Sequence, residues 1–320
     1  MLKTVYLGVD IGSISTKGVL INKENEIVAQ EYLWTKGNPI AAVQKLIFSL
    51  RQQIDDNYTI AAAGTTGSAR KLIGAMIGAD VVKNEITAHA VGTLSRRPDV
   101  RTILEIGGQD SKIILLDNGV VVDYAMNTLC AAGTGAFLSS QASRLGIAVE
   151  ELGTVALTAS SPSKIAARCT VFAESDMIHK AQAGHKKENL AAGLCSAVVS
   201  NYLNNVAKGK HLQEPVVFQG GVSKNKAVVQ EFIQQTGMEV AVDECSHLLG
   251  AVGAAILSKS AHRVTAFQPD IAGFSYHTTA TECNGCANCC EIVSFYRNEE
   301  LIDAWGNRCA KGERSKIKIS

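Results

Sequence analysis

Two stretches of the sequence match each other without a gap: Asp10-Ile11-Gly12-Ser13-Ile14-Ser15-Thr16-Lys17 and Glu105-Ile106-Gly107-Gly108-Gln109-Asp110-Ser111-Lys112. The second begins 95 residues after the first (Asp10 to Glu105), and an acidic residue, a glycine, a hydroxyl and a lysine recur in step. An internal repeat is more informative about architecture than a single motif, because it indicates that one supersecondary unit is used twice. We therefore expect two similar α/β domains that face each other.

Each copy lies among short apolar runs with the composition of β-strands. Three strands are expected around each copy, at 3–9, 17–21 and 26–33, and at 101–104, 113–116 and 119–124. The remaining chain alternates between helical and strand patterns, which is typical of an α/β protein. We expect a helix opening at Asn38-Pro39, a strand at 59–63 with a turn at 64–67, helices at 133–145, 171–180 and 188–208, a strand at 215–219, a helix at 223–235, a strand at 238–242 and a helix at 247–258.

The composition is that of a folded protein without a strong electrostatic preference. The 320 residues include 46% hydrophobic and 19% charged residues, and the formal net charge is +1. This balance gives no argument for nucleic acid or an anionic membrane as a partner. The apolar stretch at 247–257 is too short to span a bilayer, and no signal peptide is expected, so the protein is expected to be cytoplasmic.

The first copy of the repeat carries the groups that bind phosphate. It offers backbone N–H groups around Gly12, hydroxyls on Ser13, Ser15 and Thr16, and the cation of Lys17. The carboxylate of Asp10 can hold Mg²⁺ through water. The alternative is an ordinary hairpin turn, but two copies in register favour phosphate binding. The chain has no Walker-type G-x-x-x-x-G-K-[ST] string, which excludes the P-loop fold.

The repeated hairpins, with a later Gly220-Gly221 turn, resemble the actin, sugar kinase and Hsp70 superfamily, whose domains are ribonuclease H-like. The resemblance implies duplicated actin-like ATPase domains with a nucleotide cleft between them. It assigns the first copy to one phosphate site, assigns Gly107, Gly108, Gln109 and Asp110 to a second, and places Gly220 and Gly221 against the adenosine. Taken alone, the Gly220-Gly221 pair is equally a simple turn between a strand and a helix.

Two cysteines lie where helices are expected to begin. Cys130 opens the string Cys-Ala-Ala-Gly-Thr-Gly, and Cys169 lies within Ala-Arg-Cys-Thr-Val-Phe-Ala-Glu-Ser. A helix N-terminus lowers the pKa of a cysteine and favours the thiolate that binds metal. The alternative is that both are buried and act as small hydrophobic residues.

These two strings, within this ATPase frame, closely resemble the BadF/BadG/BcrA/BcrD ATPase family, which includes the activators of 2-hydroxyacyl-CoA dehydratases. The resemblance covers residues 3 to about 258. It implies a homodimer in which Cys130 and Cys169 of each chain hold one shared [4Fe–4S] cluster, and four thiolates from two chains suit a cubane. Leu129 and Ala136 depart from the family pattern, which puts the partner-facing surface in doubt more than the cluster.

The resemblance further implies an ATP-driven one-electron donor. Ferredoxin or flavodoxin would reduce the cluster, and ATP binding and hydrolysis would drive the electron to an iron–sulfur partner enzyme. In such an ATPase the protein mainly positions water and Mg²⁺. Asp10 is expected to contact Mg²⁺ through water, and Gln109 or Asp110 to orient the attacking water. His89, His179 and His185 are interpreted as packed or solvated histidines.

Five of the nine cysteines crowd the C-terminal region, which suggests a separate module there. They are Cys283, Cys286, Cys289, Cys290 and Cys309. Their C-x2-C-x2-C spacing suits a second iron–sulfur cluster or Zn²⁺, with a redox or structural thiol patch as the alternative. The expected division is two ATPase subdomains at 1–95 and 96–258, followed by a cysteine-rich extension at 259–320.

Two rival functions fit part of this evidence. A sugar or small-molecule kinase of the same fold would use the phosphate turns but would not need Cys130 and Cys169. A non-enzymatic sensor or assembly ATPase would use the cysteines only to join the two chains. An iron–sulfur absorption band would argue against the kinase.

Overall fold

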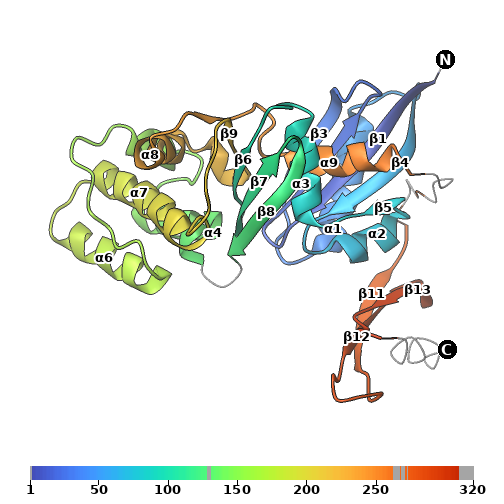
Figure 1. Ribbon diagram of the computed structural model, residues 1–320. Coiled ribbons are helices and arrows are strands. Elements are labelled where there is room, and N and C mark those ends of the chain that lie inside the picture. The colour runs from blue at the N-terminus through green and yellow to red at the C-terminus, as the bar shows by residue number, and fades with distance from the viewer. Residues whose placement is uncertain (1, 128–130, 262–266, 268–270, 272, 310–320) are drawn as a thin grey trace.

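The computed structural model describes residues 2–127, 131–261, 267, 271 and 273–309. Two five-stranded mixed sheets have the same strand order, which confirms the duplicated α/β fold (Figure 1). In the first sheet the order is β3 (Ile27–Trp34), β2 (Ser15–Ile21), β1 (Lys3–Ile11), β4 (Tyr58–Thr66) and β5 (Val81–Val82). In the second it is β8 (Val120–Asn127), β7 (Ser111–Asp117), β6 (Thr102–Ile106), β9 (Val216–Gln219) and β10 (Val240–Ala241).

The register of the two hairpins repeats as well. Asp10 pairs with Lys17 across β1 and β2, and Glu105 pairs with Lys112 across β6 and β7. In an antiparallel hairpin, directly opposed residues have side chains on the same face. Each copy therefore presents an acid and a lysine side by side at the end of its hairpin.

The helices of the first domain bury the apolar faces that the sequence indicates. Helix α1 (Pro39–Gln52) begins at the expected proline, and the side chain of Asn38 caps it by accepting from the N–H of Ala41 at 3.0 Å. Helices α2 (Arg70–Ile77) and α3 (Glu85–Leu94) follow β4 and β5. Asn84 caps α3 in the same way by accepting from the N–H of Thr87, which orients the first turn of that helix.

The last helix of the ATPase region, α9 (Leu249–Ser258), follows the second sheet in the chain but packs against β1, β4 and α3 of the first domain. Close contact requires glycine there: a Cβ at Gly64 would lie 2.1 Å from the carbonyl oxygen of Ala254. The predicted turn at 64–67 is therefore wrong. β4 continues through Thr66, and Gly64 is the strand residue that admits α9, while the turn begins at Gly67 (φ +95°).

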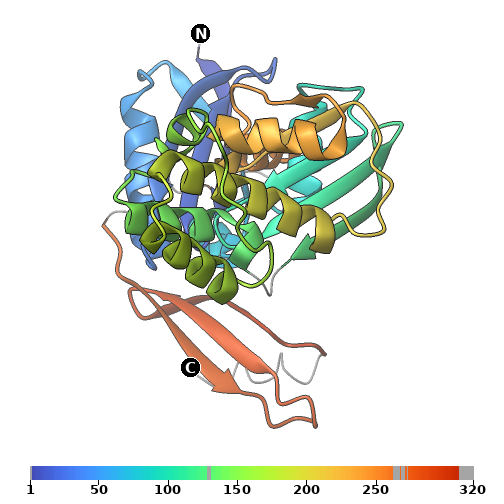
Figure 2. The ribbon, with the colours of Figure 1, turned by 90° about the vertical axis from the view of Figure 1, so that its left-hand side faces the viewer.

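Helices cover the second sheet at one end of the molecule (Figures 1 and 2). They are the 3₁₀ turn Ala131–Gly133, α4 (Gly135–Leu145), α5 (Leu152–Ala156), α6 (Thr170–Gln182), α7 (Lys187–Asn205), the 3₁₀ turn Gly221–Lys224 and α8 (Lys226–Thr236). The single helix predicted at 223–235 is in fact two elements. Asn225 is extended between them, and its side chain accepts from the N–H groups of Ala227 and Val228 to cap α8.

The C-terminal extension forms an antiparallel sheet of β11 (Tyr276–Glu282), β12 (Glu291–Arg297) and β13 (Glu300–Trp305) beside the first domain (Figure 1). Ile271 and Phe295 belong to the hydrophobic core of that domain, so the extension is packed onto it. The division at residues 95 and 258 stays a prediction. Among the described residues, none of the helices has the length and apolarity needed to cross a membrane.

Candidate nucleotide site

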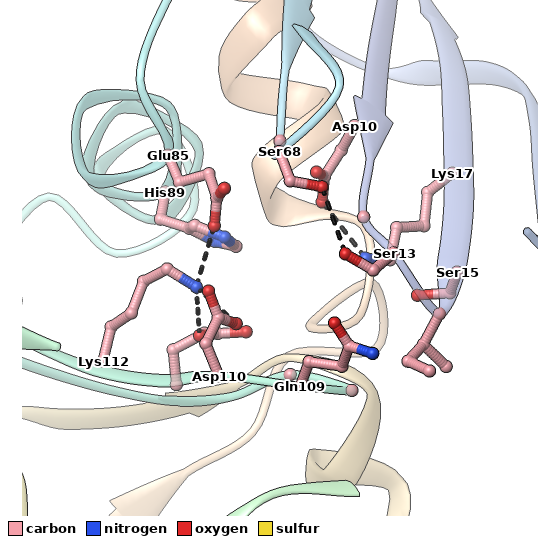
Figure 3. Close-up of a pocket in the computed structure, with 16 residues that line it drawn as sticks. Asp10, Ser13, Ser15, Lys17, Ser68, Glu85, His89, Gln109, Asp110 and Lys112 are labelled. Atoms are coloured by element: carbon pink, nitrogen blue, oxygen red, sulfur yellow. Dashed lines mark hydrogen bonds and ion pairs between the residues drawn. The ribbon is translucent and has the colours of Figure 1, made fainter. Parts of the chain in front are cut away.

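A cavity of about 200 Å³ lies between the two hairpin turns. Most of the predicted phosphate-binding residues line it (Figure 3): Asp10, Gly12, Ser13, Ser15, Lys17, Gly107, Gly108, Gln109 and Asp110. Thr16 does not line it. Its buried hydroxyl lies 2.9 Å from the Thr35 hydroxyl, which donates to the carbonyl of Gly12 at 2.8 Å. Thr16 therefore braces the first turn from behind.

The acid and lysine of the first turn form an ion pair, with Nζ of Lys17 lying 3.2 Å from Oδ2 of Asp10. Burial acts to raise the pKa of Asp10, but the charge and hydrogen bond of Lys17 outweigh it, and the pKa lies below its usual value. Burial likewise acts to lower the pKa of Lys17, while Asp10 raises it above the ordinary lysine value. Both groups are therefore ionised at neutral pH.

The second turn is organised around Lys112, whose side chain is only 1% exposed. Its Nζ lies 2.9 Å from a carboxylate oxygen of Glu85, 2.9 Å from one of Asp110 and 3.1 Å from one of Glu105. Glu85 is on α3, in the first half of the chain, so this cluster ties the first half to the second turn (Figure 3). Burial raises the pKa of Glu105 to about 7, although Lys112 acts to lower it.

The cluster separates the two candidates for orienting water. The carboxylate of Asp110 is held by Lys112. Gln109 is exposed at the cavity, and no hydrogen bond joins its side chain to another described residue. Gln109 is thus the one whose side chain is free to approach a ligand.

Sequence reasoning missed several groups of this cavity, namely Gly67, Ser68, Glu85, His89, Glu105 and Lys112. The repeat contains a signal for two of them, because it aligns Glu105 with Asp10 and Lys112 with Lys17. Of the three histidines interpreted as packed or solvated, His89 is 6% exposed and lines the cavity. His179 is exposed on α6, and Nδ1 of His185 lies 2.7 Å from Oγ of Ser163.

A second cavity of about 380 Å³ adjoins the first, and both are lined by Ile14, Gly107 and Gly108. Its other lining residues are mainly apolar or aromatic, with a few polar groups: Tyr32, Trp34, Gly135, Leu138, Ser139, Val149, Glu150, Gly221, Val222, Lys224, Asn225 and His247. Gly221 lies here as expected for a residue near a base and sugar. Gly220 does not, because it makes the turn at φ +90°, where a Cβ would lie 2.4 Å from the carbonyl oxygen of Ile106.

Cys169 is exposed and is the residue that precedes α6. Cys130 lies outside the described residues, but the segment that follows it is close to Cys169 in space. Asn201 of α7 donates to the carbonyl of Arg168 at 2.9 Å, and a Cβ at Gly133 would lie 2.9 Å from Oδ1 of Asn201. The two predicted cysteine segments therefore meet at one buried asparagine.

The other cysteines differ in their surroundings. Cys195 and Cys245 are buried, and burial raises the pKa of each thiol to about 12, so neither is a thiolate at neutral pH. Cys283, Cys286, Cys289 and Cys290 lie on the loop between β11 and β12, and Cys309 follows β13. Over the described part of the chain, no three His, Cys, Asp or Glu side chains are arranged to hold a metal ion. The predicted second metal site is thus not preformed.

Comparison with known proteins gives the same frame. Residues 7–258 match the model of the BadF/BadG/BcrA/BcrD ATPase family. The 2-hydroxyisocaproyl-CoA dehydratase activator of Clostridioides difficile is 33% identical over 78% of this chain and 93% of its own length. The (R)-2-hydroxyglutaryl-CoA dehydratase activating ATPase of Acidaminococcus fermentans is 32% identical over 78% and 95%. One of the benzoyl-CoA reductase polypeptides of Thauera aromatica is 28% identical over 81% and 94%.

Solved structures agree. Component A of the Acidaminococcus fermentans dehydratase superposes with a TM-score of 0.73, at 30% identity over 81% of this chain and all of that chain. The dehydratase activator from Clostridium difficile with bound ADPNP gives 0.74, at 33% identity over 79% and 94%. A ROK family glucokinase from Streptomyces griseus gives 0.54 at 14% identity over 80% and 99%, which shows the shared fold alone. The family match extends over most of the sequence and over both lobes of the site, and the chain belongs to the BadF/BadG/BcrA/BcrD ATPase family.

Proposed function

We propose that this protein is an ATP-dependent one-electron donor that activates an iron–sulfur enzyme of the 2-hydroxyacyl-CoA dehydratase or benzoyl-CoA reductase type. ATP, with Mg²⁺, is bound and hydrolysed in the cavity between the two turns. Two copies of the chain share one [4Fe–4S] cluster, which a ferredoxin or flavodoxin reduces. The relatives named as activators support the class of partner.

One observation carries this proposal: the turn that lines the phosphate cavity also holds the start of the cysteine-bearing helical region. The N–H of Gly135 donates to the carbonyl of Gly107 at 2.9 Å, and the N–H of Ala136 donates to that of Gly108 at 2.8 Å. A change at the turn on nucleotide binding or hydrolysis is therefore transmitted directly to the first turn of α4, which follows the Cys130 string. A kinase of this fold has no need of such a link.

The residues present fit the cluster. A [4Fe–4S] cluster needs four thiolates, and when bound it supplies a low-potential electron. Cys169 is exposed at the N-terminus of a helix of 13 residues, where the helix dipole favours a thiolate. Val171 and Phe172 beside it are exposed apolar side chains that a second copy of the chain would cover. Cys130 and Cys169 from two copies supply the four ligands.

The nucleotide cavity divides its tasks among the chain's own residues. The backbone N–H groups of the two turns bind phosphate oxygens, and the base and sugar occupy the adjoining larger cavity beside Gly221. The Asp10 carboxylate, held by Lys17, faces the cavity where Mg²⁺ is bound through water. Gln109, whose side chain is free, orients the attacking water.

The proposal is tested by measuring iron and acid-labile sulfide in anaerobically purified full-length protein. We expect about two irons per chain for one shared cluster. Cys169→Ser is expected to lose this iron, whereas Cys195→Ser, which alters a buried thiol of α7, should retain it. Iron retained by Cys169→Ser, or a colourless wild-type protein, would contradict the proposal and favour a kinase.

The C-terminal cysteines are tested separately, and by substitution rather than truncation, because the extension supplies Ile271 and Phe295 to the first domain's core. We propose that Cys283, Cys286, Cys289 or Cys290 and Cys309 bind a second metal whose site closes on binding. Metal analysis of a Cys286→Ser, Cys289→Ser double variant should show the loss of a second metal with the shared cluster intact. Equal metal contents in the variant and the wild type would refute this second site.

A further inference from the structure

His89 is a buried histidine of the cavity to which the proposed function assigns no task. It lies one turn after Glu85 on α3, the helix between the two sheets, and its imidazole points toward the centre of the cavity (Figure 3). Residues four apart share a helix face, so both side chains reach the phosphate end.

A chain of hydrogen bonds orients the ring from behind. Nε2 of Gln219 donates to Nδ1 of His89 at 2.9 Å, and the Thr93 hydroxyl donates to Oε1 of Gln219 at 2.6 Å. Gln219 and Thr93 are both buried. Since Nδ1 accepts a hydrogen bond, the neutral ring carries its proton on Nε2.

The surroundings of the ring keep it neutral. Burial, with help from the positive charges of Lys112 and Lys17, lowers the pKa of His89 to about 4, against the opposite effect of Asp10 and Glu85. At neutral pH the ring is therefore a hydrogen-bond donor without a charge. No described residue accepts from its Nε2.

Both cations of the cavity are already paired. Lys17 is bound to Asp10, and Lys112 is shared by three carboxylates. A phosphate entering the cavity needs donors that are not committed elsewhere, and an oriented neutral donor is worth most in a buried site.

We propose that His89 donates a hydrogen bond from Nε2 to the terminal phosphate of the bound nucleoside triphosphate, and so lets the site distinguish a triphosphate from a diphosphate. The glycines shared by the two cavities mark the passage from sugar to phosphates, and His89 lies beyond them, at the end that only a third phosphate reaches. This inference rests on the proposed nucleotide site.

The test is a matched pair of variants, His89→Gln and His89→Asn. A glutamine amide reaches the position of Nε2, whereas an asparagine amide reaches only that of Nδ1 and keeps the contact with Gln219. The dissociation constants of ADP and of ADPNP, a non-hydrolysable analogue of ATP, are measured for each. We expect His89→Asn to bind ADPNP about tenfold more weakly or worse with ADP binding unchanged, and His89→Gln to stay within about threefold of wild type.

A structural role would reverse this order, because asparagine would preserve the buried contact better. Equal losses for ADP and ADPNP, or normal ADPNP binding by His89→Asn, would overturn the inference. A wild-type chain that binds ADP but shows no dependence on residue 89 refutes only the inference, whereas one that binds neither nucleotide refutes the proposed site as well.

A measurement on the wild-type protein keeps the inference testable if the asparagine variant does not fold. With ¹⁵N-labelled histidine, the Nε2 signal that His89→Gln lacks should shift on addition of ADPNP and stay in place on addition of ADP. An unshifted signal with ADPNP bound would overturn the inference.

Discussion

The two phosphate turns are copies of one hairpin, yet their buried charges differ. In the first, Lys17 faces one carboxylate, and the pKa of Asp10 lies below its usual value. In the second, Lys112 is shared by three carboxylates, and the pKa of Glu105 rises to about 7. The first turn is a balanced ion pair open to a ligand, while the second is an acidic cluster that binds α3 to the second domain.

The largest difference between the turns should appear on removing Lys112. Lys112→Met leaves three carboxylates around an apolar side chain, and losing one partner of a buried pair costs about 3–5 kcal/mol of unfolding free energy. Urea unfolding at pH 7 measures it. The exposed pair of Arg101 and Asp117 provides the control, since Arg101→Met should cost about 0–1 kcal/mol. Equal effects of the two substitutions would mean that the cluster contributes no more than a surface pair.

The acids of the two turns should give opposite pH dependence. The raised pKa of Glu105 means that the folded state binds a proton that the unfolded state releases between about pH 4.5 and 7. This group therefore makes the protein less stable as pH rises through that window. Asp10, with a lowered pKa, contributes stability above its unfolded pKa and loses it as pH falls below 3.8.

The Glu105 contribution is isolated with Glu105→Gln. The loss of unfolding free energy between pH 5 and pH 8 should be smaller in the variant than in the wild type by about 2–3 kcal/mol. Denaturant titrations at the two pH values measure this difference. Identical pH dependence would show that Glu105 titrates normally.

The glycines of the turns should also differ. A Cβ at Gly108 would lie 2.6 Å from Cβ of Ile14 in the opposite turn, whereas one at Gly12 would lie 3.1 Å from the carbonyl oxygen of Ser15 within its own turn. Gly108→Ala must push the two turns apart, and we expect it to weaken ADP binding about tenfold, as an overpacked contact costs about 1–3 kcal/mol. Calorimetric titration with ADP measures it. Gly12→Ala is the comparison and should weaken ADP binding less.

The smallest difference concerns the hydroxyls behind the turns. Thr16 is hydrogen-bonded to Thr35, whereas Oγ of the equivalent Ser111 is buried without a hydrogen-bond partner among the described residues. Thr16→Val should cost about 1 kcal/mol of unfolding free energy and leave ADP binding unchanged, while Ser111→Ala should cost nothing. Weaker ADP binding by Thr16→Val would restore its predicted role in phosphate binding.

Local pattern accounts for the elements whose prediction is confirmed. The hairpins around Asp10 and Glu105, the helix at Asn38-Pro39 and the long helix α7 all follow from periodicity and capping residues close together in the sequence. The turn predicted at Gly64 is wrong because the reason for the glycine, the backbone of α9, lies about 190 residues further along.

The sequence by itself determined the duplication, the phosphate turns and the family, because each is written in residues adjacent along the chain. Only the tertiary structure decided which charges share a site: Glu85 and His89 come from α3, Lys112 from β7 and Gln219 from β9. Burial and pairing set the pKa of such groups, and both depend on neighbours brought together by folding. The sequence thus supplied the acid and lysine of both turns, and packing made one an open ion pair and the other a closed cluster.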